Sequence, residues 1–279
     1  MSHTTTAPAT RRIAHRTTGH RHGPVTRLMS PGDLGQRVKP FVFLDLFDSS
    51  GSAPGSFGLH PHSGIATLTF ITHGAVSYED TSGEKGVVAQ GGVEWMVAGG
   101  GMWHGGGWSG DAGARGFQLW VALPPGLEQG EAASTYLAPA SVPQSGPVRV
   151  LLGHYLGATS AIAAPSSMNY LAVRLKAGEH WRYGPPPGHT VAWAAIAEGE
   201  LHAPSALKAG EMAVFEESNG AIDFHAAADA EFVIGSAVKH PHELVTGYYS
   251  VHTSAEALRE GEERIRQLGD RLRLQGRLR

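Results

Sequence analysis

Cysteine is absent from this chain of 279 residues. Its absence excludes disulfide bonds, thiolate zinc sites and cysteine nucleophiles. Any bound metal must therefore be held by histidine, carboxylate or water. The chain contains 16 histidines, which are the main supply of such ligands.

Charge is also scarce, because charged residues make up only 17% of the chain and the formal net charge is -3. This balance provides no strongly basic surface, so we expect no direct binding of nucleic acid. No apolar run is long enough to cross a bilayer, and residues 1–20 lack the apolar core of a signal peptide. We therefore expect a cytoplasmic chain without membrane association, and a disordered N-terminus over residues 1–10.

Glycine and proline are abundant, with 38 and 17 residues, and they separate short apolar runs along the chain. Such runs, bounded by turn residues, are typical of β-strands. The pattern predicts an all-β fold built as a sandwich or barrel. The predicted strands lie within residues 39–47, 65–74, 92–100, 116–125, 148–157, 168–178, 190–201 and 230–238.

One helix is predicted near the end of the chain, over residues 252–275. Thr253 and Glu256 have the spacing of a capping box at its start. The spacing of its apolar residues favours a helix packed on the barrel, and a helix that binds a partner is the alternative. These apolar residues are Leu258, Ile265, Leu268 and Leu272.

The two halves of the chain resemble each other in layout, which suggests duplicated barrels. Each has a turn with glycine and histidine, an apolar strand, a polar hairpin and another strand, starting near Leu59 and near Pro185. The irregular segment between Pro124 and Pro147 contains the expected boundary, giving domains 11–135 and 136–279. Histidines at His-x-His spacing within a strand pattern occur in the first copy, so we interpret the second barrel as vestigial and metal-free.

His60 and His62 are separated by one residue in "LHPHSG". On an extended strand both side chains point to the same face, and Pro61 favours an extended conformation at His60. A tight metal site normally needs a third ligand. His104, in "GMWHGGGW", can supply it if antiparallel pairing returns that segment to the pair. The alternative is a glycine loop with an incidental histidine.

Three tryptophans lie near these histidines in the sequence, namely Trp95, Trp103 and Trp108. They are candidates for the wall of a pocket that binds a flat aromatic molecule, and packing within the barrel is the alternative. Glu94 precedes Trp95, and alternation along a strand places these two side chains on opposite faces. The pattern does not decide which face points inward, and Glu94 is not assigned as a ligand.

Several separated motifs together resemble the pirins, a family of the cupin superfamily. These motifs are "PFVFLDLF", "HPHSGIATLTFITHG", "GVEWMVAGGGMWHGG", "FQLWVALP" and "TYLAP", and the likeness continues through "PPGHTVAWAAIAEGEL" to the terminal helix. The resemblance implies an all-β fold of two stacked cupin barrels, also called double-stranded β-helices or jelly rolls, with a C-terminal helix. It also implies a single metal in the first barrel.

The same resemblance implies a metal held by three histidines and one glutamate, and the histidines fall on His60, His62 and His104. The glutamate normally lies two residues after the third histidine, where this chain has Gly106. A second acid common in the family lies four residues after the second histidine, where this chain has Ala66. Neither position carries a carboxylate in this chain. Iron is the metal implied by the family, with nickel, copper, zinc or no metal as alternatives.

Two classes of function follow from the resemblance. The first is a dioxygenase similar to quercetin 2,3-dioxygenase, in which the metal takes the oxygen atoms of a flavonol or other small aromatic and acts as Lewis acid and template. No catalytic residue is assigned, and low activity is expected without a carboxylate base. The second is a regulatory pirin that binds a protein partner. A further hypothesis is a metal-free relic whose pocket binds a small molecule.

Overall fold

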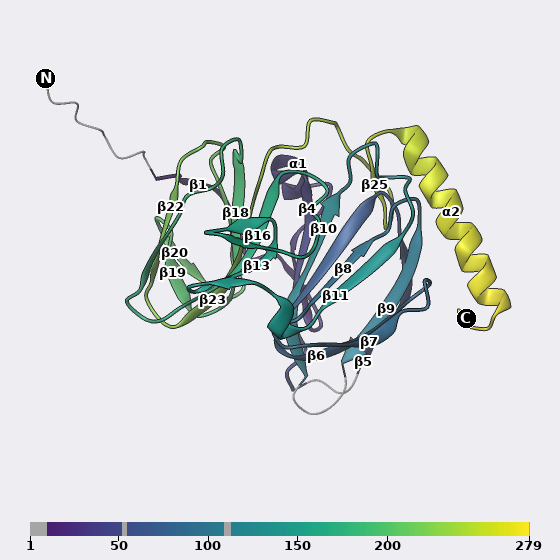
Figure 1. The fold of residues 1–279 in the computed structure, drawn as a ribbon, viewed down its shortest axis with the longest axis horizontal. Helices are drawn as coiled ribbons and strands as arrows, with labels where there is room; N and C mark the ends of the chain where they lie inside the picture. Colours follow the sequence, from purple (N-terminus) through teal and green to yellow (C-terminus); the bar gives the residue numbers. More distant parts are fainter. Residues whose placement is uncertain (1–9, 52–54, 109–112, 279) are drawn as a thin grey trace, which may run out of the picture.

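Two β-sheet halves lie side by side in the computed structural model, which describes residues 10–51, 55–108 and 113–278 (Figure 1). The helix α2 (Ala255–Leu274) runs along the outer side of the first half, away from the second. The disorder expected for residues 1–10 lies outside the described residues except at Thr10. The Thr10 hydroxyl donates to a carboxylate oxygen of Asp223 at 2.6 Å.

The first half has two layers that share one long strand, β6 (Ile65–Asp80). The first residues of β6 pair with β8 and β10 in one layer, and the residues after Gly74 pair with β7 and β9 in the other. The larger layer runs in the order β11 (Ala133–Leu137), β8 (Val93–Val97), β6, β10 (Ala114–Ala122), β4 (Phe41–Asp48), β3 (Val25–Met29) and β2 (His20–His22). The smaller layer contains β5 (Gly55–His62), β9 (Met102–Trp108) and β7 (Lys85–Ala89).

The second half also has two layers. The larger runs in the order β1 (Ile13–Thr17), β21 (Met212–Phe215), β18 (Val191–Glu198), β23 (Ala230–Ala237), β16 (Met168–Leu175), β13 (Val148–Leu152) and β12 (Gln144–Ser145). The smaller runs β17 (His180–Tyr183), β22 (Ile222–Ala226), β19 (Glu200–His202) and β20 (Ala206–Lys208). The remaining elements are β14 (His154–Tyr155), β15 (Ala158–Thr159), β24 (Val245–Thr246), β25 (Val251–His252), the helix α1 (Leu34–Val38) and a 3-10 helix (Pro139–Ser141).

The predicted all-β architecture with a C-terminal helix is confirmed, and each of the eight predicted strand regions contains a strand. The physical reason is consistent along the chain: apolar and β-branched runs form buried strands, and glycines at positive φ, such as Gly74 and Gly199, follow or interrupt them. Local pattern was therefore sufficient to identify these strands.

The interiors of the two halves differ. The second half is filled by apolar side chains between its two layers, including Trp181, Tyr183, Phe224 and Phe232. A separate core joins the two halves through their large sheets, where Phe41 packs edge-on against Trp193 with ring centroids 5.5 Å apart. Space for a ligand is consequently found inside the first half, where polar side chains replace this packing.

The division into domains 11–135 and 136–279 stays a prediction. The chain leaves the sheet of the first half at β11 and enters the sheet of the second half at β12, on either side of the 3-10 helix. Strand β1 pairs with β21 and therefore belongs to the sheet of the second half, although it precedes the first.

The terminal helix is confirmed, but the predicted capping box is wrong. The N-cap is Ser254, whose hydroxyl accepts from the backbone N–H of Ala257. The backbone N–H of Thr253 donates to Glu128 instead of to Glu256, as a capping box would require, and its hydroxyl also donates to Glu128, at 2.7 Å each. Among the residues that the structure describes, no helix is long and apolar enough to span a membrane.

Candidate metal centre

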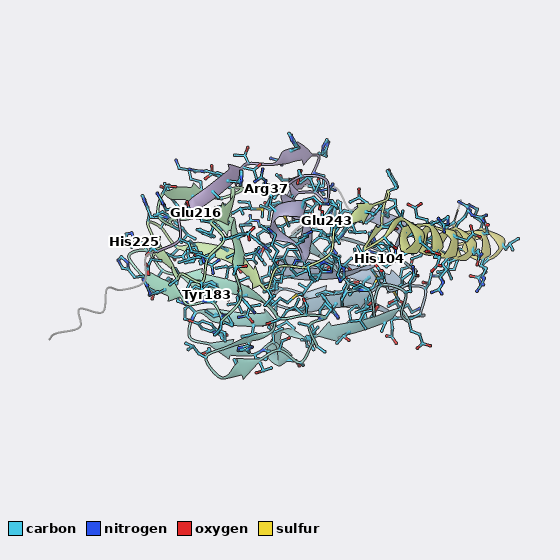
Figure 2. The ribbon with its side chains drawn as sticks, turned by 90° about the horizontal axis from the view of Figure 1, so that it is seen from above. Arg37, His104, Tyr183, Glu216, His225 and Glu243 are labelled. Atoms are coloured by element: carbon cyan, nitrogen blue, oxygen red, sulfur yellow. The ribbon has the colours of Figure 1, made fainter. Side chains whose placement is uncertain are left out.

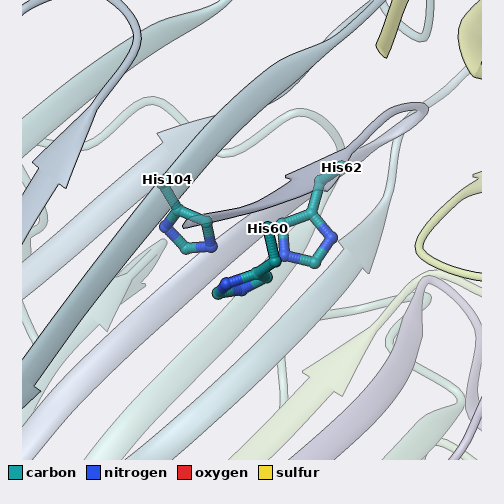
Figure 3. Close-up of side chains that lie close together, drawn as sticks. All are labelled: His60, His62 and His104. Atoms are coloured by element: carbon teal, nitrogen blue, oxygen red, sulfur yellow. The ribbon is translucent and has the colours of Figure 1, made fainter. Parts of the chain in front are cut away.

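Strands β5 and β9 bring the three predicted histidines together. They pair antiparallel with His60 directly opposite His104, and His62 lies two residues further on the same face of β5. One ring nitrogen of each histidine lies within 4.8 Å of those of the other two. Figure 3 shows the three rings converging, and Figure 2 shows that His104 lies in the half next to α2, whereas Tyr183 and His225 lie in the other.

Hydrogen bonds determine which nitrogen of His60 and His62 is available. Nδ1 of His60 lies 2.8 Å from the carbonyl oxygen of Gly58, and Nδ1 of His62 lies 3.0 Å from that of Tyr249. Because a carbonyl oxygen only accepts, both Nδ1 atoms carry the proton and donate it. The lone pairs of both Nε2 atoms are therefore free to bind a ligand.

His104 has the same arrangement with a different partner. Its Nδ1 lies 3.6 Å from Oε1 of Glu94, and both side chains are buried. Its buried Nε2 has no hydrogen-bond partner within the described part of the chain. A buried polar atom without a partner is costly unless a ligand satisfies it. Three Nε2 donors facing one another fit a divalent transition metal.

Burial also keeps the imidazoles of His60 and His62 neutral. Removal from water, together with the neighbouring His104, lowers the pKa of His60 to about 4. The same two causes, with His60 added, hold the pKa of His62 well below its usual value. Metal ligation requires the unprotonated ring, so both histidines are in the competent form at pH 7.

The histidines line a cavity of about 610 Å³ within the first half. Phe43 and Trp120 stack on one another in its wall with ring centroids 4.0 Å apart, and the Trp120 ring lies 4.7 Å from that of His62. Tyr249 covers His60 and His62 from the C-terminal segment, with centroids 5.8 Å from each. Tyr248, 85% exposed, marks the side that is open to solvent.

Comparison with known proteins shows which family part of this chain resembles. The model of the pirin family matches residues 23–121, which contain all three histidines. This part of the chain is similar to the pirins. It is 27% identical over 226 residues to a Pseudomonas aeruginosa protein that carries the provisional name quercetin 2,3-dioxygenase, covering 76% of this chain and 79% of that protein.

Two solved structures share the fold of this chain. A quercetin 2,3-dioxygenase from Acinetobacter baumannii superposes with a TM-score of 0.81 at 24% identity, covering 93% of this chain and 98% of that one. The bacterial pirin YhhW from Escherichia coli, in complex with nickel(II), superposes with a TM-score of 0.64 at 18% identity, covering 82% and 98%.

The two positions that carry an acid in the pirin pattern have no space for one, or face away from the cavity, in this chain. Gly106 lies on β9 between β5 and β6, and a Cβ atom placed on it would meet the carbonyl oxygen of Ser77 at 2.2 Å. Ala66 is fully buried in the core between the two halves, on the face of β6 that points away from the cavity. Neither position can present an acid to the histidines in this backbone.

The three tryptophans considered for the pocket lie outside the cavity wall in this chain. Trp95 is in the core between the halves, and the Trp103 indole N–H donates to the carbonyl of Ile265 on α2 at 2.8 Å. Trp108 packs on Phe57 with ring centroids 5.1 Å apart. None of the three lines the cavity, whose wall contains Trp120 instead.

Sequence reasoning missed the polar wall of the cavity, although alternation marks it. Along four neighbouring strands, residues of one parity are apolar and lie in the core, while those of the other parity line the cavity. One polar residue of this second set recurs on each strand. These residues are Asp45 on β4, Thr69 on β6, Glu94 on β8 and Gln118 on β10.

Proposed function

We propose that this chain is a metal-dependent oxygenase of the quercetin 2,3-dioxygenase type, acting on a flavonol or another small planar aromatic. The observation that carries the proposal is the meeting of three Nε2 lone pairs in an aromatic-walled cavity. The names of the Pseudomonas and Acinetobacter relatives support the reaction class.

His60, His62 and His104 are the proposed ligands of one divalent transition metal. When bound, the metal supplies Lewis-acid activation and a template for substrate oxygen atoms. Neutral imidazoles suit iron, nickel, copper and zinc. We propose iron(II) or nickel(II), the first from the family resemblance and the second because a bacterial pirin binds nickel(II).

The cavity residues bind and orient the substrate. A volume of about 610 Å³ lies in the usual range of small-molecule sites. A flat ring stacks on the aromatic wall formed by Phe43 and Trp120, which places it beside His62. Arg27, paired with Asp45 and lying over the Phe43 ring at 3.9 Å, contributes a polar edge.

Anaerobic loading of the full chain with Fe(II), Ni(II), Cu(II) or Zn(II), one at a time, tests the proposal. We expect near-stoichiometric binding of at least one metal by mass spectrometry, and consumption of O2 with loss of flavonol absorbance. His104→Ala should lower both turnover and bound metal by more than about 100-fold, because two histidines rarely hold a metal tightly. Stoichiometric metal without O2 uptake on any flavonol would contradict the proposed reaction.

A further inference from the structure

Glu94 is a buried carboxylate on the cavity side of β8. Its neighbours Val93 and Trp95 are in the core, so alternation turns its side chain to the histidines. Glu94 is 6% exposed, and its Oε1 lies 3.6 Å from Nδ1 of His104. A buried carboxylate needs such partners because loss of hydration is costly.

Two further residues orient the Glu94 carboxylate. The Thr69 hydroxyl oxygen lies 2.8 Å from Oε2 of Glu94 and 2.7 Å from the side-chain amide of Gln118. The Gln118 atom that faces Thr69 is Oε1, and a hydroxyl has only one proton, so Thr69 cannot donate to both acceptors. Turning the Gln118 amide over lets its nitrogen donate to Thr69 while Thr69 donates to Glu94. Oε2 is thereby occupied, and Oε1 remains for Nδ1 of His104.

The direction of the His104 ring completes the arrangement. Nδ1 faces Oε1 of Glu94 at 3.6 Å, and the unpartnered Nε2 belongs to the cluster with His60 and His62. A carboxylate behind a histidine selects the tautomer with the proton on Nδ1, and it makes Nε2 a stronger donor. His60 and His62 obtain the same tautomer from backbone carbonyls, which carry no net charge.

Other acids do not take this place. Gly106 and Ala66 carry no carboxylate, and the backbone leaves no room or no direction for one. Asp45 also lines the cavity, but it is paired with Arg27. Glu94 is therefore the cavity carboxylate that faces a proposed ligand, His104.

We infer that Glu94 is a positioning residue for the metal centre: it holds His104 in the Nδ1–H tautomer and returns one negative charge to a site that lacks a glutamate ligand. The inference rests on the metal site of the proposed function. A divalent ion on three neutral imidazoles has a charge of about +2, and Glu94 reduces it to about +1 at one ligand's remove.

Two variants test the inference, with Glu84→Gln on the exposed hairpin as the matched control. Glu94→Gln keeps the shape and an acceptor but removes the charge, whereas Glu94→Ala removes both. We expect about 10-fold weaker binding of Fe(II) or Ni(II) in Glu94→Gln and 10- to 100-fold weaker binding in Glu94→Ala, measured by competition with a chelator. Circular dichroism checks that both variants fold.

A second readout does not depend on metal. Nitrogen-15 NMR of the metal-free protein at pH 7 should show His104 protonated on Nδ1 in the wild type and a mixture of tautomers in Glu94→Ala. Unchanged tautomer and metal affinity within twofold of wild type in Glu94→Ala would overturn the inference and leave the proposed function standing. Absence of metal binding by the wild type would overturn the proposed function, while the tautomers would still decide whether Glu94 holds His104.

Discussion

At Gly106 the backbone of β9 passes so close to β6 that a side chain has no room. The Cβ of any other residue would lie 2.2 Å from the carbonyl oxygen of Ser77. Position 106 therefore lacks both a carboxylate and the room for one. A glutamate restored at position 106 would have to displace β6 before it could approach a metal.

We predict that Gly106→Ala and Gly106→Glu each lower the free energy of unfolding by about 1–3 kcal/mol, as overpacking does. Gly106→Glu should also fail to raise metal affinity. Urea unfolding and chelator competition measure the two effects. Gly58→Ala is the control, because Gly58 lines the same cavity and has nothing within 4 Å of its would-be Cβ. A stable Gly106→Glu variant with tighter metal binding would contradict the prediction.

At the scale of elements, one short segment contacts both the start of α2 and a proposed metal ligand. Glu128 accepts two hydrogen bonds from Thr253, and it lies 3.3 Å from Nδ1 of the buried His252. The same C-terminal segment contains Tyr249, whose carbonyl holds Nδ1 of His62. The helix start and one proposed ligand therefore depend on the same short segment.

We predict that Glu128→Ala destabilises the protein by about 1–3 kcal/mol, since two part-buried donors on Thr253 lose their acceptor. Amide hydrogen exchange should accelerate over residues 249–258 more than elsewhere. Glu131→Ala, which removes an exposed carboxylate three residues away, is the control and should leave exchange unchanged. Equal protection of residues 249–258 in the two variants would show that Glu128 does not anchor the segment.

At the scale of the whole molecule, the two halves share a core but have different interiors. The core between the large sheets contains residues from both halves, such as Phe41 and Trp193, so neither sheet buries its apolar face alone. The second half is packed with aromatic side chains, whereas the first retains a cavity lined by histidine and acid. The proposed metal site consequently lies in one of two similar frameworks.

The second half also makes stability depend on pH through His189. Burial, with the nearby charges of His154 and Arg11, lowers the pKa of His189 to about 4 from its usual 6.5. The unfolded chain therefore takes up a proton at a higher pH than the folded protein does. The contribution of neutral His189 to the free energy of unfolding is fully present above pH 6.5 and is lost as the pH falls toward 4.

We predict that His189 accounts for a loss of about 1 kcal/mol in unfolding free energy between pH 7 and pH 5. His189→Gln should reduce the pH dependence measured by urea unfolding, although His60 and His62 contribute in the same direction. His20→Gln, on the exposed strand β2, should retain the wild-type slope. A slope in His189→Gln equal to that of the wild type would refute the assignment.

Features that depend on neighbouring residues were predictable from the sequence. The strands and the terminal helix follow from apolar periodicity, and His60 and His62 share a face because they are two residues apart on a strand. The cap of α2 is Ser254 and not the predicted Thr253, and Glu128, distant in the chain, accepts the Thr253 N–H that a capping box would give to Glu256. Local capping rules contain no information about such a competitor.

The sequence by itself determined the all-β architecture and the terminal helix, because periodicity and composition encode burial locally, while the set of three histidines came from the resemblance to the pirins. Only the tertiary structure decided which face of each strand points into the cavity. That choice placed Trp120 and Glu94 in its wall and Trp95 in the core. The physical reason is that alternation defines two faces, while the sheet packed against a strand determines which face is buried.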